Sequence, residues 1–358
     1  MQTFLRAAGA RMRPAAHAFA VARAVRGIEP LVATEIQRSR LGRVRGLRHR
    51  EVWFEPSPEA DLLGLRTADD VLVAAAVVDG VGHDRSALSR LAGAARDLHP
   101  VLPAWPDAGG LEVSASFVGR RNYTRYEIED AVGAELARPS GLAYHSRRDG
   151  RRPPPDALSW RVTIEGDQAV IALRLADRPL HRRPYKTASV RGTLHPPVAA
   201  AMARLARLGD ARTVLDPCCG AGTTLIEAHA LAPRLRPAGF DHDPAAIAAA
   251  AANARAAGAS PFLWGVGDAG RLPVADGCVD RVLVNPPWGR QVPPRGALAR
   301  GPGPLWREVR RVLADDGLAV ALVHDGIPSG FVVEETHQVS LSGRHPEIAV
   351  LRKARSRG

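Results

Sequence analysis

Residues 213–224 read T-V-L-D-P-C-C-G-A-G-T-T, and this stretch decides the fold of the C-terminal half of the chain. Its apolar start predicts a buried strand that ends at Asp216. Gly220 and Gly222 predict a tight loop leading into a helix, because glycine lets the backbone turn sharply and approach a ligand closely. The amino end of such a helix favours a carboxylate. The glycine spacing differs from the G-x-G-x-x-G of a dinucleotide site and from the G-K-[ST] of a P-loop.

Helix and strand patterns alternate around this loop, from residue 196 to residue 324. Such alternation predicts a doubly wound, mainly parallel sheet, in which ligands bind at the carboxyl ends of the strands. The expected strands are 212–215, 237–240, 262–266, 280–284 and 318–324, and the expected helices are 198–208, 223–231, 244–257 and 304–313.

Two further carboxylates follow the next two predicted strands at the same edge of the sheet. Asp241 ends the second strand, where a carboxylate can accept both hydroxyls of a ribose, and Asp268 ends the third, where it can accept from an adenine amino group. A single aspartate at a strand end is usually a turn or helix-cap residue. Three of them in register on consecutive strands predict a site for S-adenosylmethionine.

The fourth strand of this half ends in the motif R-V-L-V-N-P-P-W-G-R, residues 281–290. An exocyclic amino group on a base is a poor nucleophile because its lone pair is delocalised into the ring. The side-chain oxygen of Asn285 and the carbonyl oxygen of Pro286 can each accept one amino hydrogen, which directs the lone pair towards a methyl donor. Trp288 can stack on the base. The alternative is a plain Asn-Pro turn beside a packed tryptophan. Asparagine in place of cysteine disfavours methylation of a ring carbon through a covalent adduct.

The N-terminal half has a different pattern, with strands and helices in the order of an α+β module of ferredoxin-like type. The expected strands are 51–54, 70–78, 111–118, 159–164 and 169–175, and the expected helices are 30–37, 57–65, 85–98 and 126–136. Arginines lie among tyrosines in residues 120–126 and form a basic loop in residues 145–155, a combination that suits contact with RNA phosphates. A solvated, arginine-rich surface is the alternative at each of these positions.

The net charge of +12, from 49 basic and 37 acidic residues, indicates a polyanionic partner, although the genome of a GC-rich organism would give the same arginine bias. The three cysteines, with Cys218 and Cys219 adjacent, have neither disulfide nor metal-ligand spacing, so we expect a reducing cytoplasm and no metal. We also expect no signal peptide and no membrane segment, because no stretch approaches about 20 apolar residues.

The motifs D-P-C-C-G-A-G, G-F-D-H-D-P-A-A-I, G-D-A and N-P-P-W together resemble those of the THUMP-domain RNA methyltransferases. The N-terminal half carries weaker marks of the same family. V-R-G-I-E-P-L-V-A-T-E-I is similar to its opening helix, F-V-G-R-R-N-Y with the following E-D-A-V-G-A-E-L is similar to THUMP, and P-L-H-R-R-P-Y-K is similar to its joining segment. Trp288 departs from the commoner tyrosine or phenylalanine, and the proline-rich spacer after it is particular to this chain.

The resemblance implies a Rossmann-like class I methyltransferase domain preceded by a ferredoxin-like piece and a THUMP domain. We expect a disordered tail at 1–16, the ferredoxin-like piece at 17–80, THUMP at 81–178, a linker at 179–195 and the methyltransferase domain at 196–358. The implied activity is methylation of guanine N2 by a monomer, with a tRNA acceptor stem as substrate. The alternatives are 23S rRNA guanine-N2 methylation, amino methylation of DNA, and a catalytically inactive RNA-binding scaffold.

The resemblance also assigns roles to individual residues. The target base would meet Asn285, Pro286, Pro287 and Trp288. The cofactor would meet Thr193, Asp216, Cys218, Gly220, Gly222, Thr223, Asp241, His242, Asp268, Ala269 and Asn285. RNA would meet Arg120, Arg121, Tyr123, Arg125, Arg147, Arg148, Arg182 and Arg183.

Overall fold

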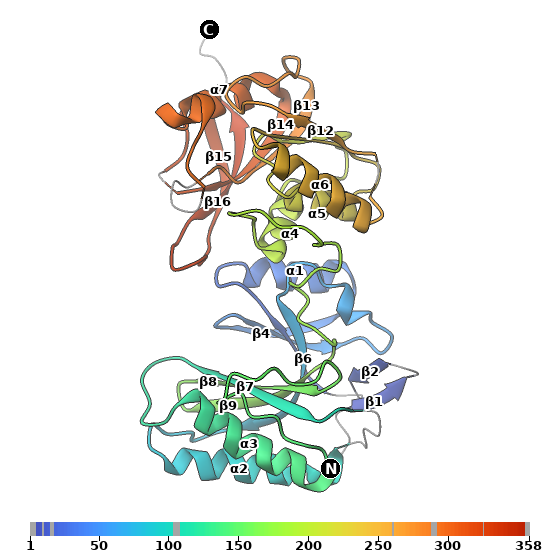
Figure 1. Cartoon of the computed structure of the whole chain (residues 1–358), viewed down its shortest axis with the longest axis vertical. Helices are drawn as coiled ribbons and strands as arrows, with labels where there is room; N and C mark the ends of the chain where they lie inside the picture. The colour runs from blue at the N-terminus through green and yellow to red at the C-terminus, as the bar shows by residue number, and fades with distance from the viewer. Residues whose placement is uncertain are drawn as a thin grey trace. The chain divides into compact units, whose positions relative to one another are not determined.

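The computed structural model describes residues 5–8, 11–14, 18–102, 108–259, 261–287, 292–324 and 326–354. The chain forms two compact units: the first comprises residues 1–24 and 32–180, and the second comprises residues 25–31 and 181–358. We call them the N-terminal unit and the C-terminal unit, and Figure 1 shows the elements of each.

The N-terminal unit is built on one seven-stranded sheet. Its strands lie in the order β4 (Gly42–Arg48), β5 (Glu51–Pro56), β3 (Ala20–Arg23), β6 (Asp70–Val78), β9 (Gln168–Arg174), β8 (Leu158–Glu165) and β7 (Leu111–Phe117). All neighbours are antiparallel except β7 and β8. Because β6 pairs with β9, the pieces predicted at 17–80 and 81–178 share one continuous sheet.

Two helices, α2 (Ser86–Asp97) and α3 (Arg125–Ser140), pack side by side against this sheet (Figure 1). Leu91 of α2 and Ile128 of α3 are fully buried with Trp160 of the sheet. These helices were predicted because their apolar residues recur at helical spacing. Helix α1 (Glu29–Arg38) follows β3, as its sequence pattern indicates.

The structure differs from the sequence predictions of this unit at residues 57–65 and at two strands that were not predicted, β3 and β4. Residues 57–65 form only a 3-10 turn, Leu62–Gly64, where Asp61 caps a single turn rather than a full helix. The strand β4 was not predicted, because its arginines obscure any apolar alternation. Within residues 1–16, for which a disordered tail was expected, β1 (Leu5–Ala8) pairs with β2 (Arg11–Pro14).

The C-terminal unit contains the predicted doubly wound sheet. Its strands lie in the order β12 (Leu263–Val266), β11 (Arg236–Asp241), β10 (Thr213–Asp216), β13 (Val279–Val284), β14 (Leu313–Val323), β16 (Glu347–Lys353) and β15 (Phe331–Gln338). The first five are parallel, and β16 and β15 add an antiparallel edge. This antiparallel edge was not predicted: β15 is mostly solvent-exposed beyond its initial F-V-V, and the buried run I-A-V-L of β16 was overlooked.

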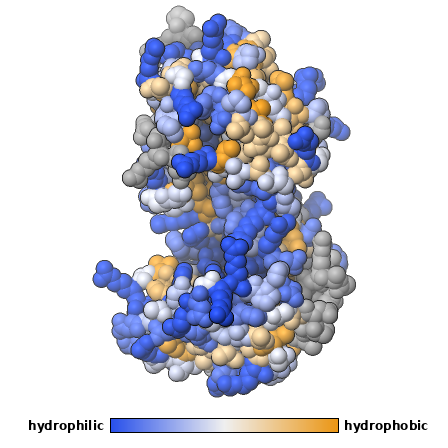
Figure 2. All heavy atoms as spheres, viewed as in Figure 1, coloured by the Kyte–Doolittle hydropathy of each residue, from blue (hydrophilic) through white to orange (hydrophobic). Residues whose placement is uncertain are grey.

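Four helices accompany this sheet: α4 (Pro196–Leu205), α5 (Thr223–Leu231), α6 (Pro244–Ala256) and α7 (Gly303–Val312). Leu305 and Val309 of α7 are buried against Val282 and Val284 of β13, which fixes one side of the sheet. Figure 2 shows a mostly hydrophilic surface on the face in view, with apolar residues gathered over α6, whose sequence is largely alanine. Within the described residues, no helix has the length and apolar character needed to cross a membrane.

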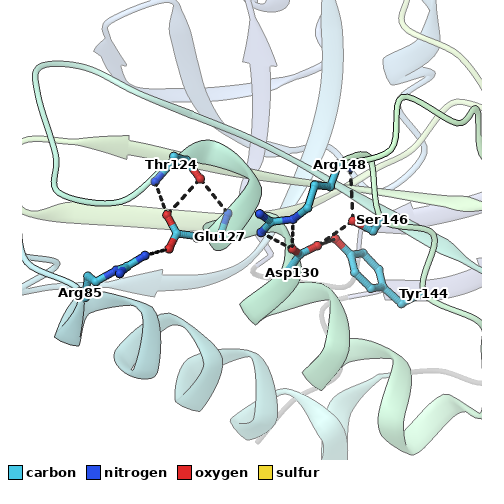
Figure 3. A network of polar contacts seen from close by, with 7 residues as sticks. All are labelled: Arg85, Thr124, Glu127, Asp130, Tyr144, Ser146 and Arg148. Atoms are coloured by element: carbon cyan, nitrogen blue, oxygen red, sulfur yellow. Dashed lines mark hydrogen bonds and ion pairs between the residues drawn. The ribbon is translucent and has the colours of Figure 1, made fainter.

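Helix α3 starts at a capping box that ties it to α2 (Figure 3). The Thr124 hydroxyl accepts from the Glu127 amide at 3.3 Å, and the Glu127 carboxylate accepts from the Thr124 amide at 2.8 Å. Arg85 forms an ion pair with the same carboxylate. The bond from the Thr124 backbone and the one from Arg85 lower the pKa of Glu127.

We predict that Thr124→Ala lowers the free energy of unfolding by about 1 kcal/mol, because the first-turn amide loses its side-chain acceptor. Urea denaturation followed by circular dichroism measures the change. Thr124→Ser is the matched control, since it keeps the hydroxyl and should unfold like the wild type. Equal losses in both variants would contradict the capping role.

Candidate active site

The glycine loop between β10 and α5 has the backbone that the sequence predicts. Gly220 and Gly222 adopt positive φ angles of 51° and 77°, and Gly222 is the residue that caps α5. The Cys219 amide donates to the carbonyl oxygen of Phe240 at 2.9 Å, which fastens the loop to the end of β11. The Thr223 hydroxyl is buried at the start of α5 and has no hydrogen-bond partner among the described residues.

Asp216 supports this loop from within. Its carboxyl group is 1% exposed, accepts from the Cys218 amide at 2.9 Å and accepts from the Thr224 hydroxyl. Burial raises the pKa of Asp216 to about 7, despite these two hydrogen bonds. Asp216 therefore positions both ends of the glycine loop, and its direct contact with the cofactor stays a prediction.

Asp241 joins the glycine loop to the second strand end. Its Oδ2 accepts from the Gly220 amide at 2.9 Å and its Oδ1 accepts from the Asp243 amide at 3.0 Å. The ring of the exposed His242 lies 3.4 Å from Oδ1. Each carboxylate oxygen has a second lone pair, so Asp241 can hold the loop and still accept from a ribose hydroxyl.

Asp268 has an equivalent role at the third strand end. Its Oδ1 accepts from the Gly270 amide and its Oδ2 from the Ala297 amide, both at 2.8 Å. A Cβ on Gly296 would come 2.4 Å from Oδ2, so this glycine is needed for the close approach. Ala269 is buried in the core. Asp268 therefore anchors the segment that follows the Asn-Pro-Pro motif, a link that the sequence did not indicate.

The Asn-Pro-Pro motif follows β13 directly, and Asn285, Pro286 and Pro287 are all half-buried. Trp288 lies outside the described residues. Strands β12, β11, β10 and β13 are consecutive neighbours in the sheet and run parallel, so their carboxyl ends meet at one edge. This edge therefore brings together Asp268, Asp241, the glycine loop and Asn285.

The residues at this edge fit S-adenosylmethionine. The buried Thr223 hydroxyl and the first-turn amides of α5 offer donors to a carboxylate. Asp241 and Asp268 offer acceptors to ribose and adenine. Cys218 and Cys219 contribute packing, because burial raises the pKa of both thiols well above its ordinary value and keeps them un-ionised.

Trp264 on β12 is a residue of this site that sequence reasoning missed. A Cβ added to Gly239 would lie 2.4 Å from its indole ring, and one added to Gly222 would lie 2.9 Å from it. The ring also stacks on Phe262, with centroids 5.2 Å apart. Trp264 therefore packs directly on the backbone of the glycine loop and of β11.

Residues 181–195, predicted as part of a linker, belong to the C-terminal unit. Arg183 is 9% exposed and donates to the buried Glu227 carboxylate of α5 at 3.0 Å. The Tyr185 hydroxyl donates to the same oxygen at 2.8 Å. The guanidinium of Arg183 is buried in this ion pair, and its contact with RNA stays a prediction. Its neighbour Arg182 is exposed.

Asn253 on α6 connects this segment to the glycine loop. Its side chain is fully buried, donates to the carbonyl oxygens of Ala188 at 2.9 Å and Ala221 at 3.0 Å, and accepts from the amides of Thr187 and Ala188. The predicted cofactor residue Thr193 closes the turn that follows, since its hydroxyl donates to the Val190 carbonyl at 2.6 Å. Val190 in turn lies against Gly220.

Two predicted RNA-binding residues of the N-terminal unit make hydrogen bonds within the fold. The Arg121 guanidinium donates to the carbonyl oxygens of Val81, Gly82 and Gly166. Tyr123 is 3% exposed and its hydroxyl donates to the Gly82 carbonyl at 2.8 Å. Both side chains join loops around the sheet, and their contact with RNA stays a prediction.

The other predicted RNA-binding residues of this unit reach solvent. Arg120 and Arg125 are exposed, and the guanidinium of Arg125 lies 4.6 Å from the ring centroid of Tyr126. Arg147 is 3.9 Å from Glu112. Arg148 donates twice to Asp130, which also accepts from Tyr144 and Ser146 (Figure 3). Arg120 and Arg125 are thus the less restrained of these cations.

The doubly wound sheet, the glycine loop and the row of strand ends define a Rossmann-like methyltransferase unit. The family model of UPF0020, the RMKL-like methyltransferase domain, matches residues 183–329. The tRNA (guanine(6)-N2)-methyltransferase of Thermus thermophilus is 33% identical over 259 residues, which cover 70% of this chain and 75% of that enzyme. The chain belongs to this family of S-adenosylmethionine-dependent methyltransferases, which confirms the predicted catalytic fold and cofactor.

Structural comparison extends the similarity to both units. The crystal structure of TrmN from Thermus thermophilus matches with a TM-score of 0.76 and 30% identity, covering 94% of this chain and 100% of that chain. The ribosomal RNA large subunit methyltransferase K/L of Aliivibrio fischeri is 26% identical over 239 residues, which cover 53% of this chain but only 32% of that enzyme. The THUMP assignment within the N-terminal unit stays a prediction.

We predict that Asp216→Asn removes a pH dependence of stability. The carboxyl pKa rises from its ordinary value near 3.8 to about 7 on folding, so ionisation opposes folding and stability falls as pH rises between those values. Asparagine keeps the neutral form at every pH and can bond to both loop ends. In urea denaturation, the free energy of unfolding of the wild type should fall relative to that of Asp216→Asn as the pH rises from 5 to 8, by a few kcal/mol at most. A pH-independent difference would contradict the assignment.

We predict that Asn253→Ala weakens cofactor binding. Four backbone contacts lose their partner, so we expect about 2–3 kcal/mol less stability and a roughly tenfold higher Kd for S-adenosylmethionine, measured by calorimetry. Asn122→Ala removes the exposed asparagine of the N-terminal unit, which donates to Asp84, and is the matched control. An unchanged Kd in Asn253→Ala would show that residues 187–190 do not support the glycine loop.

Proposed function

We propose that this protein transfers the methyl group of S-adenosylmethionine to the exocyclic N2 of a guanosine in tRNA. The observation that carries the proposal is the position of Asn285 and Pro286 at a parallel strand end next to the strand that leads into the glycine loop. The relative that shares both units acts on tRNA guanine N2, and the similarity extends over most of both chains.

The residues of the chain perform the positioning in this reaction. S-adenosylmethionine supplies an electrophilic methyl group when it is bound, so no strong base is needed. The Asn285 side-chain oxygen and the Pro286 carbonyl oxygen accept the two amino hydrogens of the base, which holds the nitrogen lone pair in line. Asp268 restrains residues 296–297 beyond the motif, which limits the movement of this corner.

The substrate within the RNA class is the finer part of the proposal. We place the target guanosine in the acceptor stem, with Arg120, Arg125, Arg147, Arg148 and Arg182 as candidate phosphate contacts. Ribosomal RNA is the second candidate, favoured by the ribosomal RNA relatives, although the chain spans about a third of their length. We further propose that the protein acts as a monomer in the cytoplasm, where its free cysteines Cys218, Cys219 and Cys278 would stay reduced.

We predict that the purified protein labels tRNA with methyl groups from S-adenosylmethionine, and that nucleoside mass spectrometry identifies N2-methylguanosine. Separate pools of ribosomal RNA and DNA run in parallel. Asn285→Ala should lose about 100- to 1000-fold in rate, because an acceptor aimed at the reacting amine is gone.

Thermal unfolding of Asn285→Ala serves as the control for folding and should match that of the wild type. Label in ribosomal RNA or DNA alone would overturn the tRNA assignment and leave the amine chemistry in place. Full activity in Asn285→Ala would overturn the role of the motif. Cofactor binding without label in any pool would favour the inactive scaffold.

A further inference from the structure

Residues 38–50 of the N-terminal unit read R-S-R-L-G-R-V-R-G-L-R-H-R, which is six arginines and one histidine with no acidic residue. All six arginines are exposed to solvent. The segment begins on the last turn of α1, passes through a turn and runs along β4. We call these residues the arginine strand. The proposed function uses none of them.

The fold presents the arginine strand at the edge of the molecule's first sheet. Strand β4 ends the strand order and pairs only with β5 among the described strands. Arg40 adopts a positive φ of 53° in the turn that reverses the chain from α1 into β4. Val44 pairs with Phe54 and Gly46 pairs with Trp53, so Arg45 is the extra residue of a β-bulge. A bulge redirects its side chain, which separates Arg45 from the regular alternation.

Few carboxylates balance this charge. Arg45 lies 2.6 Å from Glu55, and Arg50 lies 3.7 Å from Asp69. Arg48 donates to the Gln168 amide oxygen and lies 4.7 Å above the ring of Trp53. Throughout the described ranges, no carboxylate lies within 4.0 Å of the guanidinium groups of Arg38, Arg40 and Arg43.

We propose that the arginine strand binds the sugar-phosphate backbone of a double-stranded segment of RNA. This inference rests on the proposed function and names a surface for the same substrate class. Arg38 on the last turn of α1, Arg40 in the turn and Arg43 on β4 place three uncompensated guanidinium groups close together in the sequence, and each can neutralise one phosphate of an RNA backbone. Arginine also bonds phosphate through two parallel N–H groups.

The composition of the surface favours a duplex over a single strand. Single-stranded RNA is held mainly by stacking of its bases on aromatic rings, and residues 38–50 contain no phenylalanine, tyrosine or tryptophan. The Trp53 ring is buried beneath Arg48, and Phe19 packs against it at 6.1 Å. Backbone contact to an A-form helix needs only cations and hydrogen-bond donors, which the arginine strand supplies.

Protection of a sheet edge is the competing explanation, because exposed edge strands often carry charges that prevent pairing with another chain. It accounts for the arginines within β4. It does not account for Arg38 on α1 or Arg40 in the turn, which precede the strand. The experiment therefore replaces both Arg38 and Arg40.

The test compares two triple variants of the full-length protein with equal loss of charge. Arg38→Gln, Arg40→Gln and Arg43→Gln together remove the uncompensated charges of the arginine strand. The control replaces Arg234, Arg236 and Arg255 with glutamine. These three are exposed, and they lie at the amino end of β11 and the last turn of α6, away from the strand ends that hold Asp241 and Asn285. Thermal unfolding checks both variants, with Arg43→Gln alone as a fallback.

Binding is measured by fluorescence anisotropy over a range of salt, with a tRNA, an RNA duplex of about 20 base pairs and a single strand of the same sequence as probes. We expect the arginine-strand variant to bind tRNA and duplex at least about tenfold more weakly at about 0.1 M salt, with the slope of log K against log salt reduced by about 2–3. We expect the control variant to stay within about twofold of the wild type.

Binding of tRNA and duplex within about twofold of the wild type, with an unchanged slope, would show that the arginines only protect the edge. A loss confined to the single strand would overturn the duplex assignment. Methyl transfer is measured separately. If duplex binding depends on the arginine strand but the wild-type protein does not methylate tRNA, the proposed function is contradicted and the binding proposal stands. If the arginine-strand variant methylates tRNA with an unchanged KM for tRNA, the proposed role of the arginine strand is contradicted and the proposed function stands.

Discussion

A chain that leaves a buried strand at Asp216 and begins a helix at Thr223 must satisfy the polar groups of the intervening loop without help from water. The Asp216 carboxyl group does this from the inside, by accepting from Cys218 at one end of the loop and from Thr224 at the other. A buried carboxyl is itself costly, which is why its pKa rises to about 7. The geometry of the cofactor site therefore depends on Asp216: its hydrogen bonds order the glycine loop, and they offset the free-energy cost of burying its carboxyl group.

The remaining parts of the site are held to this loop by contacts across the sheet. Gly220 donates to Asp241, Trp264 packs on Gly222 and Gly239, and Asn253 joins Ala221 to the segment before α4. In these contacts, a glycine leaves room for a neighbouring side chain, or a side chain pairs with a backbone group that would otherwise have no hydrogen-bond partner. A rigid cofactor edge fits the chemistry, because an amine methyltransferase acts mainly by aligning two reactants.

The strand-end residues could be predicted because their signals are local. Asp216, Asp241, Asp268 and Asn285 each follow a recognisable apolar strand, and the parallel fold brings such ends together. Asn253, Glu227 and Trp264 could not be predicted, since their partners lie on other elements and in distant parts of the sequence. Residues 57–65 and β4 were misjudged for a related reason: one capped turn resembles a helix start, and dense charge hides a strand period.

Arginine shows most clearly where sequence reasoning stops. Arg183 forms a buried ion pair with Glu227, and Arg121 donates to backbone carbonyl oxygens. Burial lowers the pKa of Arg161 to about 10, and its guanidinium donates to two serine hydroxyls. A count of charges alone would assign all three of these arginines to RNA binding. Burial removes a guanidinium from contact with phosphates, so the net charge of +12 says less about partners than the few cations that remain exposed and unpaired. In the N-terminal unit, residues 38–50 hold three of them, which is why position rather than total charge locates the candidate RNA surface.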